Sequence, residues 1–264
     1  MPHIIAIPQP MPLQPEFESL VSNARNGLCS GLGALLDSLY LYGSVSRGNA
    51  RPGQSDLDLT VVLTRPPSRE ESNALECIRL DLQARHPEVS KVDFDLGVRE
   101  DVLNPANLHS WGYWIKHECR CIHGTDLALQ FPAFAPSRTI ALAINGDYMR
   151  ALGDYAQRID DASEPGDRKR LQREAARKLI RATNVLRAAE DSCWPRTLEE
   201  HAGNFGRHHP DMAAEIGFFL AESEAPSTSS RLFNDKLRRF VSWMQQIQPA
   251  VSVRSTPSSD PSRR

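Results

Sequence analysis

The stretch Leu39–Leu63, which reads LYLYGSVSRGNARPGQSDLDLTVVL, decides the expected fold of this chain. Its first residues alternate as in a strand, the chain turns at Gly43-Ser44, and a second strand follows after a loop. Asp56 and Asp58 stand two residues apart where that second strand begins. Because successive side chains of a strand point to opposite faces, both carboxylates are expected to project from the same face.

A further pair of acids follows in Lys91–Gly97, KVDFDLG, where Asp93 and Asp95 alternate with apolar residues. The alternation predicts another strand with its acids on one face. Converging carboxylates repel one another unless a cation lies between them, and Mg²⁺, which prefers oxygen ligands, is the usual partner. Three carboxylates on neighbouring strands can hold two metal ions about 3.5–4 Å apart, which suits in-line phosphoryl displacement.

The turn between the first two strands is a candidate phosphate site. Gly43 allows the backbone to approach a ligand closely, and Ser44 offers a hydroxyl and an N–H at the start of the turn. Arg47 follows in the loop, and its guanidinium suits a triphosphate. A solvated loop residue is an equally good interpretation of Arg47.

These motifs together resemble the nucleotidyltransferase superfamily that includes DNA polymerase β. Gly43-Ser44, Arg47-Gly48 and the segment 55–59, SDLDL, are most similar to the bacterial aminoglycoside and minimal nucleotidyltransferases. The family also has a strand that ends in Tyr-Gly-x-Asp. Residues 121–126, CIHGTD, are similar, with His123 where tyrosine is usual. The resemblance covers about the first half of the chain.

The resemblance implies a site with assigned roles. Three carboxylates would bind two Mg²⁺ ions and act in catalysis: Asp56, Asp58 and Asp93. The family's third acid usually opens the strand alternation, which favours Asp93 over Asp95 as ligand and general base, with Asp95 in a supporting position. The turn would contact the nucleotide, expected to be ATP, through three residues: Gly43, Ser44 and Arg47.

The implied reaction is transfer of a nucleoside monophosphate to a hydroxyl of a small molecule such as an aminoglycoside, with release of pyrophosphate. Such an activity would give antibiotic resistance. Two alternatives stay open: modification of a protein or tRNA, as in antitoxin-type adenylylation, and a non-catalytic nucleotide-binding regulatory module. The large helical half of the chain argues against the first alternative, and the presence of all three acids argues against the second.

The order of expected elements before residue 130 is helix, strand, strand, helix, strand, helix, strand. This order predicts an α/β (α+β) domain with a mixed sheet and helices against one face. A first helix over 16–25 is expected to break at Gly27, Gly31 and Gly33. A second helix should begin after Ser68 and end near Arg85. Strands are expected over four ranges: 38–42, 57–63, 91–98 and 119–123.

Everything after a proline-containing linker at 131–137 looks helical, which predicts an all-α helical-bundle domain. Its strongest helix is expected over 168–190 and carries a basic stripe that includes Arg177 and Arg181. A solvated helix face is the favoured interpretation of this stripe, and contact of these two arginines with nucleotide or acceptor is the alternative. His208-His209 is expected at the surface. The expected domains are a flexible arm (1–14), a nucleotidyltransferase domain (15–130), the helical domain (138–248) and a disordered tail (249–264).

The charges nearly cancel, with 31 Lys and Arg against 33 Asp and Glu, so nucleic acid is not indicated as a partner. Five scattered cysteines do not suggest a disulfide framework, and a reduced, cytoplasmic protein is expected. No signal-peptide pattern or run of about 18–20 apolar residues is found, so no membrane partner is expected. The expected partners are a nucleoside triphosphate and a small hydroxylated acceptor, and the expected state is a monomer or homodimer.

Overall fold

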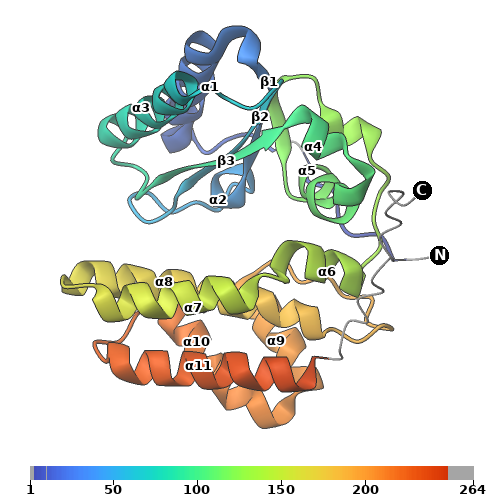
Figure 1. Cartoon of the computed structure of the whole chain (residues 1–264), viewed down its shortest axis with the longest axis vertical. Helices are drawn as coiled ribbons and strands as arrows, with labels where there is room; N and C mark the ends of the chain where they lie inside the picture. The colour runs from blue at the N-terminus through green and yellow to red at the C-terminus, as the bar shows by residue number, and fades with distance from the viewer. Residues whose placement is uncertain (1–2, 10, 249–264) are drawn as a thin grey trace, which may run out of the picture. The chain divides into compact units, whose positions relative to one another are not determined.

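A computed structural model describes residues 3–9 and 11–248 (Figure 1). These residues form two compact units. The first contains the chain up to Ile144 together with Ser192–Trp194, and the second contains Asn145–Asp191 together with the residues from Pro195 onward. The tail that was expected to be disordered, 249–264, lies outside the described residues.

A four-stranded mixed sheet forms the frame of the first unit. Its strands are β1 (Leu36–Tyr42), β2 (Leu57–Leu63), β3 (Val92–Val98) and β4 (Arg120–Gly124). Their order in the sheet is β3-β2-β1-β4. β1 pairs antiparallel with both β2 and β4, whereas β2 and β3 run parallel. The mixed sheet expected from the sequence is confirmed.

The helices α1 (Pro15–Leu32) and α3 (Arg69–Arg85) cover one face of this sheet and share a buried core with it. α3 begins where the sequence predicted, because Ser68 and Glu71 form a capping box. The Ser68 hydroxyl accepts a hydrogen bond from the N–H of Glu71, and the Glu71 carboxylate accepts one from the N–H of Ser68.

α1 continues through Gly27 and Gly31, where the sequence analysis expected a break. A Cβ atom on Gly31 would lie 2.6 Å from Cδ1 of Ile78 on α3, and one on Gly27 would lie 3.6 Å from Cγ2 of the same side chain. Gly31 therefore lets the Ile78 side chain of α3 pack closely on α1, whereas a Cβ at position 27 would make an ordinary van der Waals contact. This packing outweighs the low helix propensity of glycine. α1 ends before Gly33, whose φ of +50° departs from the helix.

Helices also cover the second face of the sheet, so the expectation of helices on one face alone is wrong. α4 (Arg99–Leu103) and α5 (Tyr113–His117) pack there with Tyr40 and Val62 in a separate buried core. In Figure 1 this pair of helices is separated from α1 and α3 by the strands. Tyr40 and Val62 alternate with the strand residues that face α1 and α3, so each face of the sheet has a core of its own.

Residues 3–9 and 11–14, the described part of the segment before α1, form no helix or strand, and parts of this segment are anchored to the first unit. Ile5 is buried, and its N–H donates to the carbonyl of Phe134 at 2.9 Å. The Gln14 side chain donates to the Ala50 carbonyl at 3.1 Å and accepts from the Ala50 N–H at 2.9 Å. These contacts correct the expectation of an arm that is flexible throughout 1–14.

The second unit is helical, and α6 (Arg138–Asn145) leads into it. Its helices are α7 (Tyr148–Asp161), α8 (Pro165–Ala182), α9 (Leu198–His208), α10 (Ala213–Glu224) and α11 (Ser230–Ile247). No described helix in either unit has the length and apolar character needed to cross a membrane.

α8 is shorter than the helix expected over 168–190. It gives way to a 3₁₀ turn, η5 (Thr183–Leu186), directly after Ala182. The Thr183 hydroxyl donates to the carbonyl of Ile180 at 2.7 Å. This side-chain bond occupies a carbonyl at the end of the helix and favours its termination.

Candidate active site

The acids singled out in the sequence come from adjacent strands of the sheet. Asp58 on β2 is in register with Asp93 on the parallel strand β3, and Tyr42 at the end of β1 is the antiparallel partner of Asp58. Asp56 lies one residue before β2. Because residues in register project side by side, the sheet arranges these groups as neighbours.

The three carboxylates converge. One oxygen from each of Asp56, Asp58 and Asp93 lies within 4.8 Å of the other two, and all three residues are half-buried. Across residues 3–9 and 11–248, no other three His, Cys, Asp or Glu side chains come together in this way. A compact set of carboxylate oxygens is the donor set that suits Mg²⁺.

Gly43 lies against this group of acids. Its φ is +74°, a conformation that other residues rarely adopt, and a Cβ atom there would lie 2.0 Å from Oδ2 of Asp58. Ser44 follows in the short helix α2 (Gly43–Ser46), and Arg47 comes directly after it with an exposed side chain. The turn predicted as a phosphate site is therefore next to Asp58.

Two further residues touch the acids, and the sequence analysis did not single them out. The Ser90 hydroxyl donates to Oδ1 of Asp56 at 2.5 Å, and Nζ of Lys91 lies 2.8 Å from Oδ1 of Asp93. Both residues immediately precede β3. The backbone N–H of Ser90 donates to the carbonyl of Ser55 at 3.0 Å, which brings the two segments together. Their position just before an acidic strand is the signal that could have identified them.

Residues 21–119 match the nucleotidyltransferase domain family. This segment is a nucleotidyltransferase domain. It includes the three converging acids and Gly43, which confirms the resemblance drawn from those motifs.

The fold agrees with that assignment. A solved structure with a similar fold is spectinomycin adenyltransferase AAD(9) from Enterococcus faecialis with ATP and spectinomycin. The sequence identity is 14%, the TM-score is 0.53, and the similarity covers 85% of this chain and 98% of the other. No curated protein sequence matches the chain. The similarity to the solved structure supports the fold: a nucleotidyltransferase domain followed by helices.

In the nucleotidyltransferase domain, Asp95 has a different partner from the other acids. Its Oδ2 accepts a hydrogen bond from the Tyr42 hydroxyl at 2.6 Å. Burial, followed by the charges of Asp58 and Asp95, raises the pKa of Tyr42 well above its ordinary value. The phenol therefore stays protonated and remains a donor. Asp95 lies outside the group of three carboxylates formed by the other acids.

Trp114 supports Tyr42 from the second face of the nucleotidyltransferase domain. Their rings meet edge to face with centroids 4.8 Å apart. The indole Nε1 donates to the Thr60 hydroxyl on β2 at 3.0 Å. Aromatic packing and a directed hydrogen bond thus hold the ring that borders Asp58 and Asp95.

The two arginines singled out in the helical half, Arg177 and Arg181, lie on α8 of the second unit. Arg177 is half-buried and Arg181 is exposed. Arg181 is one of two arginines whose charge contributes to a lowered pKa of His201, a residue that the sequence analysis did not single out.

Proposed function

We propose that this protein transfers a nucleoside monophosphate, AMP from ATP, to a hydroxyl group of a small molecule and releases pyrophosphate. The observation that carries the proposal is the convergence of Asp56, Asp58 and Asp93 to within 4.8 Å inside a nucleotidyltransferase domain. Their exposure leaves them accessible to ligands, since each residue is only half-buried.

Asp56, Asp58 and Asp93 would hold two Mg²⁺ ions. When bound, Mg²⁺ supplies positive charge that neutralises the attacking and leaving oxygens of phosphoryl transfer. The fit of the donor set rests on three features: carboxylate oxygens, their mutual distance, and the glycine at position 43, where any side chain would collide with the Asp58 carboxylate.

In the proposed reaction the acceptor hydroxyl gives its proton to Asp93 while its oxygen forms a bond to the α-phosphorus. The bond between that phosphorus and the oxygen bridging to the β-phosphorus breaks, and pyrophosphate leaves. Gly43 and Ser44 contact the phosphates through the turn, and Arg47 supplies a guanidinium for them. Much of the catalysis then comes from alignment of the two substrates.

We propose an aminoglycoside-like compound as the acceptor and antibiotic resistance as the role, carried out in the cytoplasm. Support comes from the similarity of the fold to spectinomycin adenyltransferase, because this similarity covers most of both chains.

The test is an incubation with α-labelled ATP, Mg²⁺ and, in separate reactions, aminoglycosides including spectinomycin, lincosamides and tRNA. We expect one of the small molecules to acquire the label, and we expect pyrophosphate release to require the presence of that molecule. Asp58→Asn should abolish both. Asp101→Asn, at an exposed residue on α4, is the matched control and should leave them unchanged. Transfer by Asp58→Asn at the wild-type rate would contradict the proposal, as would label on tRNA alone.

A further inference from the structure

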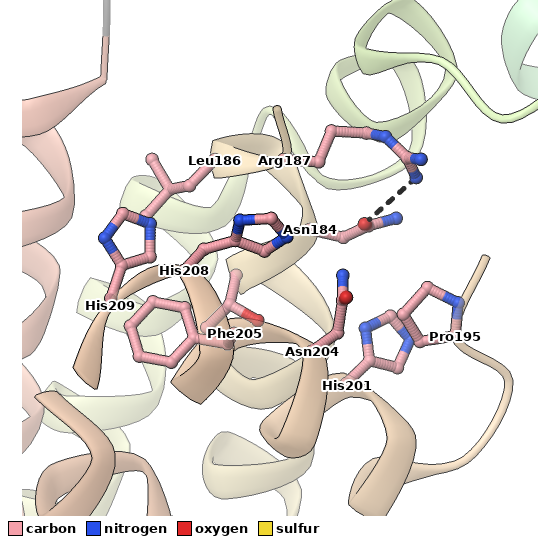
Figure 2. A pocket seen from close by; sticks show the side chains of 10 residues that line it. Asn184, Leu186, Arg187, Pro195, His201, Asn204, Phe205, His208 and His209 are labelled. Atoms are coloured by element: carbon pink, nitrogen blue, oxygen red, sulfur yellow. Dashed lines mark hydrogen bonds between the residues drawn. The ribbon is translucent and has the colours of Figure 1, made fainter. Parts of the chain in front are cut away.

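The second unit contains a hollow between the turn η5, which follows α8, and the helix α9 (Figure 2). Its volume is about 260 Å³, counting the part that opens to solvent. Because this volume includes open solvent, the hollow suits one small polar group rather than a whole enclosed ligand. Most of its polar lining comes from six residues: Asn184, Arg187, His201, Asn204, His208 and His209.

One ring nitrogen of His201 is buried without a hydrogen-bond partner among the described residues. That nitrogen is Nδ1. A neutral imidazole has one N–H donor and one acceptor nitrogen, and a buried polar atom without a partner destabilises the folded state. An orphaned polar atom beside a hollow is therefore a reason to look for a ligand.

The neighbouring polar groups already have other partners. The Asn204 amide donates to Oδ2 of Asp191 at 2.9 Å, and its oxygen accepts from Arg207 at 2.7 Å. The Arg187 guanidinium donates to the oxygen of Asn184 at 3.3 Å, the bond drawn in Figure 2, and also to the backbone carbonyl of Asp191. These bonds hold the wall of the hollow in place without using His201.

The charges around His201 favour one class of ligand. Burial and the positive charges of Arg181 and Arg187 lower its pKa to about 3, so the ring is neutral at physiological pH. Burial and His208 also lower the pKa of His209. A positive field at a neutral ring attracts a negatively charged group and repels an ammonium group.

One acid, Asp191, contacts two residues that line the hollow. Its carboxylate accepts from the Asn204 amide and lies 3.7 Å from Nε2 of His208. It does not figure among the groups that shift the pKa of His201, whereas the two arginines do. Asp191 is thus engaged with Asn204 and His208, whereas the charges that lower the pKa of His201 are those of the two arginines.

We propose that this hollow binds a small oxyanion, a carboxylate or phosphate group, which supplies the hydrogen-bond partner that His201 lacks. Both groups share the required chemistry, because each has negatively charged oxygens that accept from an imidazole N–H. The site belongs to the second unit alone. It is distinct from the three acids and does not depend on the proposed nucleotidyl transfer.

The direct test is an NMR titration of the full chain, labelled on histidine, at constant ionic strength. The probes are inorganic phosphate, acetate and, as the cationic control, methylammonium. Saturable movement of the His201 ring signals with phosphate or acetate is expected, with a rise of about one unit or more in the His201 pKa when the site is filled. The anion that saturates the site at the lower concentration identifies the preferred group, a phosphate or a carboxylate. Equal or non-saturating movement with all three probes would overturn the proposal.

Variants separate a binding role from a purely structural one. His201→Leu removes both ring nitrogens, so the Tm without anion should stay equal or rise, while phosphate affinity should fall at least about tenfold. His123→Leu, at an exposed residue of β4, is the matched control and should keep wild-type phosphate binding. If His201→Leu fails to fold, His201→Gln is measured instead. If the folded His201 variant binds phosphate as tightly as the wild type, the proposal is wrong.

Discussion

Gly43 and Asp58 are so close that no side chain fits between them. A Cβ atom on residue 43 would lie 2.0 Å from Oδ2 of Asp58, and the backbone at Gly43 has a φ of +74°. Both observations explain why residue 43 is a glycine. The turn after β1 comes very close to Asp58, which lies near the start of β2. The position of the Asp58 carboxylate therefore depends on a missing side chain in the neighbouring turn.

Gly43→Ala is expected to displace that carboxylate and to strain the turn. We expect nucleotidyl transfer to fall by about a hundredfold or more, since small misplacements of catalytic groups have effects of that size. The strained conformation should lower the free energy of unfolding by about 1–3 kcal/mol. Steady-state kinetics and urea denaturation measure the two effects. Gly53→Ala is the control for strain alone, because Gly53 also has a positive φ, of +73°, but has open space around its Cβ position. Equal activity of both variants would contradict this account.

Under the proposed function, the ion pair between Lys91 and Asp93 would compete with a metal ion for the same carboxylate. Its side chains are 43% and 37% exposed, so solvent screens much of the attraction. Lys91→Met removes the competing charge, and we expect half-maximal activity at a Mg²⁺ concentration about two- to fivefold lower. Lys91→Arg keeps the charge and should resemble the wild type. A higher Mg²⁺ requirement in Lys91→Met would mean that Lys91 helps to assemble the site.

Ser90 orients Asp56 through its hydroxyl, which donates to Oδ1 at 2.5 Å. Ser90→Ala should lower kcat/KM by about three- to tenfold, the equivalent of about one hydrogen bond. The fold should persist, because the bond is exposed. Ser72→Ala, at an exposed serine near the start of α3, is a matched control and should keep full activity. If Ser72→Ala also lost activity, the effect of Ser90→Ala could not be assigned to its hydrogen bond with Asp56.

Tyr42 should make the free energy of unfolding depend on pH in the alkaline range. Its ordinary pKa is 10.0, and burial with the charges of Asp58 and Asp95 raises it in the folded protein. Above pH 10 the unfolded chain releases this proton while the folded chain retains it, so stability should fall as pH rises. Tyr42→Phe removes this contribution, and its stability should fall less between pH 10 and 11. Urea midpoints at several pH values measure the difference. Identical pH profiles would show that Tyr42 is not the group responsible.

His117 joins the N-terminal segment to the chain near residue 134. The N–H of Phe134 donates to Nε2 of His117 at 3.0 Å, so the proton lies on Nδ1, which is 3.2 Å from the carbonyl of Ala6. His117→Ala should lower the free energy of unfolding of the first unit by about 2–4 kcal/mol, because a buried side chain and two hydrogen bonds are lost. Limited proteolysis should then cut the N-terminal segment sooner. His123→Ala, at an exposed position, should leave cleavage unchanged.

The group of three acids was predictable because strand geometry decides it. A period of two places Asp56 and Asp58 on one face, and the parallel pairing that follows from the order of elements brings Asp93 beside them. The choice of Asp93 over Asp95 as the third member of the predicted site agrees with the grouping, although their roles in metal binding and catalysis stay predictions.

Other contacts depend on how distant segments meet, which no local pattern reveals. Ser90 and Lys91 reach the acids because one loop lies beside another. Gly27 and Gly31 look like helix breakers until the packing of α3 is known. No local pattern around His201 indicates that its Nδ1 atom is buried without a hydrogen-bond partner among the described residues.

The contact between Trp114 and Tyr42 gives this protein an intrinsic spectroscopic probe. Indole emission responds to the charge and polarity of its surroundings, and this ring touches a phenol that borders two of the acids. Nucleotide or metal arriving at those acids should change the fluorescence without any attached dye. The other three tryptophans of the chain can be replaced by phenylalanine to isolate that signal.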